Sequence, residues 1–135
     1  MAIVHLTTAI QTSCITPVKT AIDAGSTGGL IDIYTGTIPI DASTAIVAQV
    51  KLGTLTFSKP CGTVTTGMLT MSAITSGTAI ATGTAAWARL KDSTGATVGD
   101  IDVGSSGSGA VLQMNTTNIV NTGPILITSF EFHIG

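Results

Sequence analysis

Residues 85–104 concentrate side chains that could act together in catalysis. This segment holds five of the twelve charged side chains, together with the single Arg and the single Trp of the chain. The five are Arg89, Lys91, Asp92, Asp100 and Asp102. Such a cluster could supply an acid, a base and an electrostatic clamp, because catalytic groups lie close together.

A β-hairpin accounts for the same residues better. The basic side chains alternate along one predicted strand and the acidic ones along the next, where opposite-charge pairs contribute about 0.2 to 1 kcal/mol each. Between them, Asp92 can bond to the backbone downstream, and Gly95 tolerates the positive φ of a hairpin turn. The segment has no His, Cys or Tyr to act as nucleophile or base. We therefore predict a structural hairpin and no enzyme; its marker residues are Trp87, Arg89, Asp92 and Gly95.

Other candidate sites in the sequence have weaker support. Residues 104–109, GSSGSG, lack the following Lys of a phosphate-binding loop. His5, His133, Cys14 and Cys61 are four possible zinc ligands, but their spacing matches no zinc motif. We predict no catalytic, cofactor-binding or metal-binding residues, and we expect both cysteines to be reduced thiols, because two-Cys chains without a signal peptide usually are.

The composition indicates one domain, much of whose surface is in contact with other protein subunits. The chain has 135 residues, which suits a single domain spanning 1–135. Only 9% of the residues are charged, against about a quarter in a typical soluble domain, which favours an assembly subunit. The net charge is −2 and no basic run is present, so we expect no nucleic-acid partner. No apolar stretch reaches the ~18 residues of a membrane span, so we expect no membrane partner.

The N-terminal segment, residues 1–25, has a helical pattern. Apolar residues recur every four positions and place one stripe on one helix face: Leu6, Ile10, Cys14, Val18 and Ile22. Pro17 predicts either two short helices or a second helix that begins with Thr16 as N-cap. Gly25 is the predicted end of the helix.

The remainder, residues 30–135, has a β composition with alternating apolar positions between turn residues. We predict about eight strands, in an all-β, jelly-roll-like antiparallel β-sandwich that follows the short N-terminal helix. The eight segments are LIDIYTG, AIVAQVKLG, LTF, MLTM, AAWARLK, TVGDIDV, AVLQM and ILITSFEFHI.

Several segments carry a resemblance to known proteins. The most specific are the hairpin pattern A-x-W-x-R-[LI]-x-D-S-x-G and the segment NTTNIVNTGPILITSF, which begins at Asn115. With TTAIQTSCITPVKTAIDAG, LIDIYTGT and LGTLTFSKP they cover most of the chain, which resembles small β-rich proteins encoded among the structural genes of tailed bacteriophages and prophages. The resemblance implies a virion structural protein, and it transfers no catalytic residue.

The last predicted strand indicates a contact with another chain. Ile125 and Ile127 alternate away from Leu126, so neither side of the strand is fully polar over its first half. The helix stripe covers part of this surface, and we expect subunit contacts to cover the rest. The predicted interface residues are Leu6, Ile10, Val18, Ile125 and Ile127.

We therefore expect a capsid decoration (cement) protein that binds the lattice of the major capsid protein and stabilises the head. Many repeated weak contacts would add stability by mass action. We expect a homo-oligomer, a trimer or dimer, that is made in the host cytoplasm and carried on the capsid surface of the virion. The alternatives are a tail-tube, head-tail or fibre component, or a carbohydrate-binding jelly-roll module.

Overall fold

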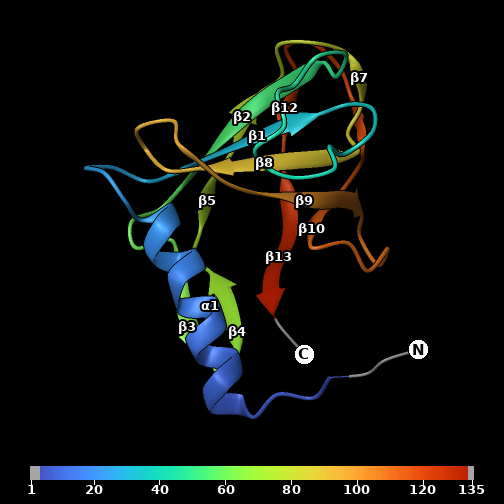
Figure 1. Ribbon diagram of the computed structural model, residues 1–135. Helices are drawn as coiled ribbons and strands as arrows, with labels where there is room; N and C mark the ends of the chain where they lie inside the picture. The colour runs from blue at the N-terminus through green and yellow to red at the C-terminus, as the bar shows by residue number, and fades with distance from the viewer. Residues whose placement is uncertain (1–3, 134–135) are drawn as a thin grey trace.

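The computed structural model describes residues 4–133, which form one helix and thirteen strands. The mainly β character predicted from the composition is confirmed. In Figure 1, one group of strands crosses the upper part of the molecule, and the helix lies below it beside a second group of strands.

The helix, α1 (Thr8–Ile22), continues through Pro17, so the predicted break at this proline is wrong. Thr7 caps the N-terminus, because its hydroxyl accepts a hydrogen bond from the Ile10 N–H at 3.4 Å. Thr16, the residue directly before the proline, donates its Oγ1 hydroxyl to the Thr12 carbonyl at 2.8 Å. Pro17 has no N–H to donate to the Ser13 carbonyl, so the helix continues with one backbone hydrogen bond fewer. Beyond the helix, Gly25 adopts a positive φ of 91°.

The buried face of α1 differs from the predicted stripe. Ile15 and Ile22 are fully buried, and Val18 is partly buried against the core. Ile10 and Cys14 are exposed instead. The reason is geometric: a strict four-residue period turns by about 40° per step relative to the 3.6-residue helix, so the predicted stripe winds away from the buried face.

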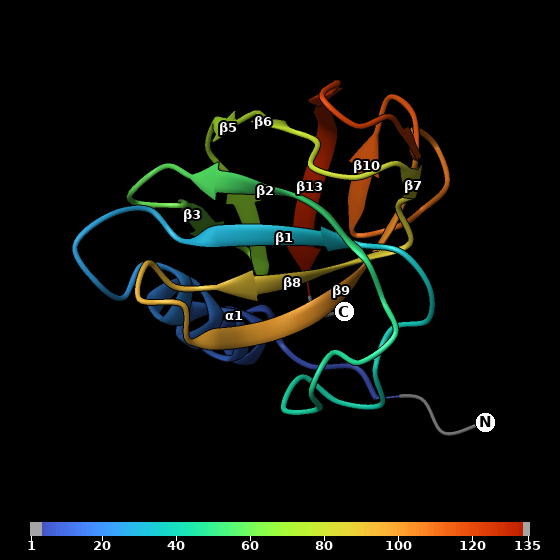
Figure 2. The same cartoon turned by 90° about the horizontal axis from the view of Figure 1, so that it is seen from above.

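Nine strands form one hydrogen-bonded sheet in the order β3-β4-β13-β10-β9-β8-β1-β2-β5. Figure 2 shows β1, β8 and β9 side by side, with α1 beneath β8 and β9. The bounds are β1 (Leu30–Tyr34), β2 (Lys51–Phe57), β3 (Gly62–Thr65), β4 (Met68–Met71), β5 (Ile74–Thr75), β8 (Trp87–Lys91), β9 (Thr97–Ser105), β10 (Leu112–Met114) and β13 (Ile127–His133).

One pair in this sheet corrects the antiparallel prediction. β9 and β10 run parallel, with Val103 opposite Leu112. The connection between them is a short loop, residues 106–111, in which Gly107 and Gly109 have positive φ. The loop carries the backbone back to the level of Val103, so that β10 runs beside β9 in the same direction. The sheet is therefore mixed rather than antiparallel throughout.

Four further strands form two small sheets. β6 (Gly77–Thr78) pairs with β12 (Pro124–Ile125), and β7 (Gly83–Thr84) pairs with β11 (Asn118–Ile119). These two-residue strands lack the sustained alternation by which strands are recognised in a sequence.

Three predicted strands have different limits in the structure. The predicted strand at 45–53 starts only at Lys51, and LTF belongs to the same strand, β2. The predicted strand at 125–134 is divided, because Ile125 ends β12 and Ile127 begins β13. Residues 35–50 consequently form a long loop between β1 and β2.

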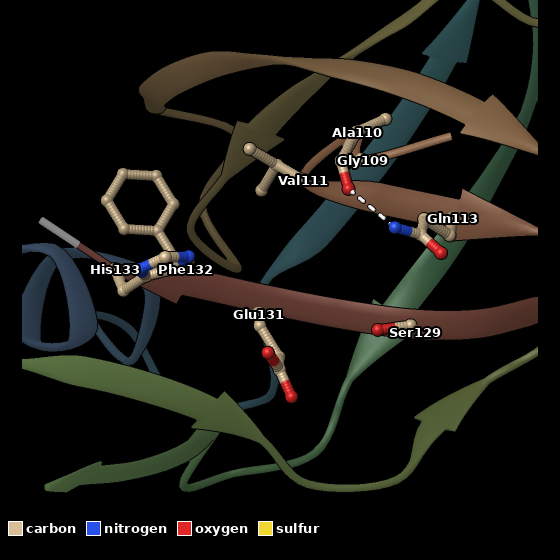
Figure 3. Close-up of a pocket in the computed structure, with 8 residues that line it drawn as sticks. All are labelled: Gly109, Ala110, Val111, Gln113, Ser129, Glu131, Phe132 and His133. Atoms are coloured by element: carbon tan, nitrogen blue, oxygen red, sulfur yellow. Dashed lines mark hydrogen bonds between the residues drawn. The ribbon is translucent and has the colours of Figure 1, made fainter. Parts of the chain in front are cut away.

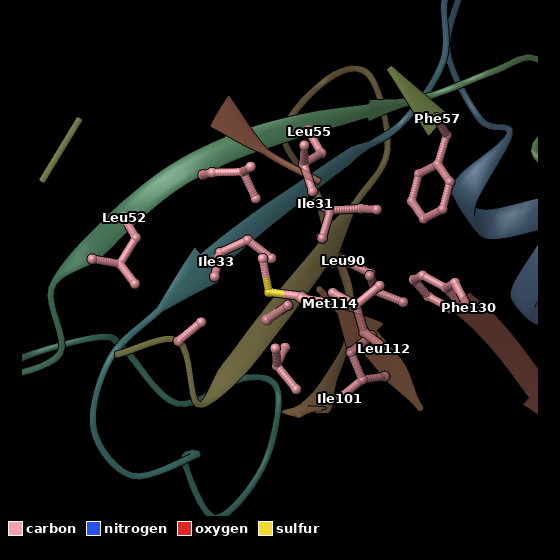
Figure 4. Packing of buried hydrophobic residues seen from close by; sticks show 14 of the residues in the cluster. Ile31, Ile33, Leu52, Leu55, Phe57, Leu90, Ile101, Leu112, Met114 and Phe130 are labelled. Atoms are coloured by element: carbon pink, nitrogen blue, oxygen red, sulfur yellow. The ribbon is translucent and has the colours of Figure 1, made fainter. Parts of the chain in front are cut away.

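The hydrophobic core lies on one face of β1, β2, β8 and β9, where the curled sheet turns β10 and β13 toward them. Figure 4 shows Ile31 and Leu90 from the first group close to Leu112 and Phe130 from the second. Phe57 on β2 meets Phe130 on β13 edge to face, with 5.8 Å between ring centroids. The opposite face of β1 and β8 carries the charged side chains.

Candidate functional site

The hairpin expected at residues 85–104 is present as β8 and β9. Arg89 lies opposite Asp100 and Trp87 opposite Asp102 in the antiparallel register. In the turn, Asp92 Oδ1 accepts hydrogen bonds from the Thr94 side chain and from the backbone N–H groups of Thr94 and Ala96. These hydrogen bonds lower the pKa of Asp92, and the bond from the Thr94 hydroxyl has the largest effect. Gly95 completes the turn with a φ of 91°.

Arg89 forms a buried bidentate ion pair. Its Nε and Nη2 donate to the two carboxylate oxygens of Asp100 at 2.7 and 2.8 Å, and the two side chains are only 7% and 6% exposed. The hydrogen bonds to Asp100 raise the pKa of Arg89. The cross-strand pairing of opposite charges predicted for the hairpin is therefore present, and the pair is buried. Loss of one partner from a buried pair costs about 3 to 5 kcal/mol, because the other charge is left buried and unpaired.

The third donor of Arg89 reaches outside the sheet. Its Nη1 donates to the Thr44 carbonyl in the 35–50 loop at 3.0 Å. Trp87 also bonds to this loop, near its base: the indole Nε1 donates to the Thr35 carbonyl at 3.1 Å. Its indole also stacks on Tyr34, with centroids 4.7 Å apart, and Arg89 Cζ lies 5.5 Å from the ring centroid. The hairpin thus holds the loop against the sheet.

Asp32 is a charged residue of this face that the sequence analysis missed. Its side chain is buried and its carboxylate contacts Lys91 at 2.8 Å, Lys51 at 3.0 Å and Thr54 Oγ1 at 2.6 Å. Burial alone raises the pKa of Asp32, but the hydrogen bonds from these partners outweigh it and hold the pKa below its ordinary value. The available signal was Asp32 itself, an acidic residue inside the otherwise uncharged strand LIDIY.

The charged side chains of this face contact one another. Asp32, Arg89 and Asp100 each have internal partners, and within residues 4–133 no buried side-chain nitrogen or oxygen lacks one. In the same part of the chain, no three His, Cys, Asp or Glu side chains gather in a way that could hold a metal ion. Within this charged cluster, Arg89 is the residue whose side chain bonds to the 35–50 loop, through the Thr44 carbonyl.

A small groove lies elsewhere, along β10 and β13 (Figure 3). It measures about 240 Å³, below the range of about 300 to 1,000 Å³ typical of ligand sites. Glu131 and His133 contribute ionisable groups, and Gln113 is held by the Ala110 carbonyl and the Gly107 N–H. The groove brings no acid, base and nucleophile into hydrogen-bond contact among the residues that line it, so we assign it no chemistry.

Both cysteines are free in the structure, Cys14 exposed and Cys61 buried. Burial, together with the nearby Asp23 carboxylate, raises the pKa of the Cys61 thiol to about 11. Asp23 also accepts a hydrogen bond from the Cys61 backbone N–H at 2.8 Å, so this contact joins the end of α1 to the start of β3.

The predicted interface residues have different environments. Ile125 is fully buried within its own chain, where its side chain packs against Gly53, so its assignment to an interface is wrong. The β6–β12 pairing turns it toward the core, which the alternation within one continuous strand did not predict. Val18 and Ile127 are partly buried against the core, Leu6 is half-buried and Ile10 is 50% exposed.

The most exposed large apolar side chains lie outside this predicted set. Ile40 is 100% and Val47 89% exposed, and both belong to the 35–50 loop. The sequence predicts residues 45–50 as part of a strand and predicts no element for residues 37–44. The combination of Ile38 and Ile40 around Pro39, followed by the polar turn DAST, was the signal available.

No protein-family model, curated protein or solved structure matches this chain. No helix within residues 4–133 is long and apolar enough to cross a membrane.

Proposed function

We propose that this chain is a virion structural protein of a tailed bacteriophage or prophage, and more specifically a capsid decoration protein that binds the lattice of the major capsid protein. One observation carries the proposal: Asp32, Lys51, Arg89, Lys91 and Asp100 of the sheet pair with one another, whereas large aliphatic side chains remain on the surface. Such a surface suits contact with protein better than chemistry on a small substrate.

The proposal includes a homo-oligomer, a trimer or dimer, made in the host cytoplasm and carried on the capsid surface. It also includes the finer description of the fold as a jelly-roll-like sandwich. Supporting that description, the curl of the nine-stranded sheet places β2 opposite β13, so that Phe57 meets Phe130 across one core, as two sandwich layers do.

A carbohydrate-binding module is less well supported. The rings of Tyr34, Trp87, Phe57 and Phe130 are buried in the chain, and Phe132 is half-buried. Sugar-binding platforms need exposed rings, and these rings are used for packing instead.

Co-sedimentation with expanded, empty capsids of the phage that encodes the chain tests the proposal. We expect the protein to pellet with capsids in a saturable manner, at a fixed ratio to the major capsid protein, and to raise the temperature at which capsids disrupt. An unrelated β-rich protein of similar size is the control. Absence of co-sedimentation at any salt concentration contradicts the proposal, and binding to purified tails under the same conditions would favour the tail alternative.

A further inference from the structure

The segment between β1 and β2 contributes no side chain to the core. Figure 2 shows it as a wide loop between the arrowhead of β1 and the start of β2, and we call its residues 36–49 the strap. Every side chain of the strap is exposed or half-buried, and Ile40 and Val47 are among the most exposed aliphatic residues. The apolar residues that pack in or against the core all come from other segments of the described chain. The burial that stabilises the sheet therefore does not hold the strap.

The base of the strap is tied to the sheet by several hydrogen bonds. The Thr35 N–H donates to the Val50 carbonyl, and the Val50 N–H donates to Thr35 Oγ1, both at 3.0 Å. The Trp87 indole donates to the Thr35 carbonyl. Directly above these bonds, Gln49 Nε2 donates to the Thr37 carbonyl at 2.7 Å. The two ends of the strap are therefore held beside each other.

The middle of the strap is held to the rest of the protein by one hydrogen bond. Arg89 Nη1 donates to the Thr44 carbonyl at 3.0 Å, and within residues 4–133 no other hydrogen bond joins the strap to a residue outside it. The remaining bonds of the middle are internal: the Thr44 N–H donates to the Asp41 carbonyl at 3.1 Å, and the Ser43 N–H donates to Asp41 Oδ1 at 2.9 Å. This turn fixes the backbone around the carbonyl that Arg89 contacts.

Asp100 orients Arg89 for this contact. Its carboxylate accepts hydrogen bonds from Nε and Nη2 at 2.7 and 2.8 Å, which leaves Nη1 for the Thr44 carbonyl. The guanidinium can contact Asp100 and Thr44 at once because its donors point in fixed directions. The single ammonium nitrogen of a lysine cannot lie at both places. The contact between sheet and strap therefore depends on an arginine.

Opening of the strap costs much less free energy than unfolding of the sheet. When Nη1 leaves the Thr44 carbonyl, water hydrogen-bonds to both groups, and no apolar side chain leaves the core. Loss of a hydrogen bond from a charged donor shifts such an equilibrium by about ten- to a hundredfold. Segments with few buried contacts open locally, while the rest of the fold stays intact.

We propose that the strap opens as one unit about its base, and that the bond from Arg89 to the Thr44 carbonyl is the latch that keeps it closed. The proposal goes beyond the proposed function and does not depend on it. The latch sets the fraction of molecules in which Ile40 and Val47 hold fixed positions. Binding that requires these positions is weakened in proportion to the fraction of molecules with an open strap.

Proteolysis of the folded chain by thermolysin measures the opening. This protease cleaves before large aliphatic residues, of which the strap has four: Ile38, Ile40, Ile46 and Val47. Cleavage requires a displaced backbone, so its rate follows the opening equilibrium, and the masses of the first fragments show whether the strap was cut. We expect Arg89→Lys to raise the rate of strap cleavage about tenfold or more, because it keeps a positive charge beside Asp100 and loses the latch.

Asp32→Asn is the matched control. It alters the same charged face, but the partners of Asp32 are Lys51, Lys91 and Thr54, which lie outside the strap. We expect this variant to be less stable in denaturant and to show the strap cleavage rate of the parent chain. A general loss of stability would accelerate cleavage in both variants, whereas loss of the latch accelerates it in Arg89→Lys alone.

A variant within the strap gives a second test that leaves the sheet intact. Asp41→Ala removes the carboxylate that holds the turn before Thr44, and Asp41 is exposed. We expect it to accelerate strap cleavage in the parent chain and to add little in Arg89→Lys, because both changes act on the same latch. The proposal is overturned if neither variant accelerates strap cleavage, if Asp32→Asn accelerates it as much as Arg89→Lys, or if the two latch variants have fully additive effects. Failure to pellet with capsids contradicts the proposed function alone.

Discussion

At the residue scale, Trp87 joins the sheet to the long loop. Its ring is buried, stacks on Tyr34 and is hydrogen-bonded to the Thr35 carbonyl. We expect Trp87→Ala to lower the free energy of unfolding by about 3 to 5 kcal/mol. Trp87→Phe should cost less, because an aromatic ring still stacks on Tyr34, and the hydrogen bond and part of the buried ring volume are lost. Urea denaturation followed by far-UV circular dichroism measures both, and equal midpoints for parent and Trp87→Ala would contradict a buried ring.

Asp32 makes stability depend on pH. Its folded-state pKa lies below the unfolded value, so the folded state binds fewer protons between the two, and stability falls as pH decreases through this interval. We expect Asp32→Asn to destabilise the protein by about 1 to 3 kcal/mol at neutral pH. Below about pH 4 the difference should shrink, because the parent carboxylate becomes protonated as well.

Denaturation of the parent chain and of Asp32→Asn at a series of pH values gives this difference directly. Asp102→Asn serves as a control: Asp102 is exposed and accepts a hydrogen bond from the Val111 N–H, which the Asn side-chain oxygen can still accept. A difference between parent and Asp32→Asn that stays constant from neutral pH to pH 3 would show that the ionised carboxylate does not contribute.

At the element scale, the β3–β4 turn is docked against α1. Gly67 has a φ of +76°, its N–H donates to Thr12 Oγ1 at 3.0 Å, and a Cβ added to it would lie 2.5 Å from Gln11 Cβ. Gly67→Ala should therefore suffer both backbone strain and a clash with the helix. Gly95 also has positive φ, but nothing lies within 4 Å of its added Cβ.

Comparison of the two alanine variants separates these effects. Gly95→Ala should cost about 1 kcal/mol from backbone strain alone. Gly67→Ala should cost about 1 to 3 kcal/mol more, because the helix must move to relieve the clash. Thermal or urea denaturation measures both variants, and equal losses of stability would contradict the close packing of α1 on the turn.

At the scale of the whole molecule, contact between Phe57 and Phe130 closes the curled sheet. Phe57 lies on β2 and Phe130 on β13, which are not neighbours in the sheet, and the two rings meet edge to face. A double-mutant cycle with Phe57→Leu and Phe130→Leu should give a coupling energy of about 0.5 to 1.5 kcal/mol. A matched cycle between Phe130→Leu and Trp87→Phe pairs residues on opposite faces and should be additive within about 0.5 kcal/mol. Equal coupling in both cycles would contradict closure through this contact.

The sequence by itself determined the features that depend on neighbouring residues. The hairpin of β8 and β9 follows from alternation on both sides of a turn with Asp92 and Gly95, and the β-rich composition indicates the fold class. The helix was also visible, because apolar residues recur near the helical period. Its buried face was not visible, because a four-residue repeat drifts around the helix. The packing of α1 on β3, β4, β9 and β13 decides that Ile15 and Ile22 are buried.

Only the tertiary structure decided which charges and apolar side chains are buried. Asp32 sits beside Lys51 and Lys91, which are distant in sequence, so no local pattern predicts their contact. Ile125 is turned inward by pairing with β6, whereas Ile40 is left in solvent because its loop is fixed by Arg89 and Trp87 from below. The physical reason is common to these cases. Whether a side chain is buried depends on all its contacts with segments far apart in the chain, and these contacts cannot be predicted from the residue types of one segment.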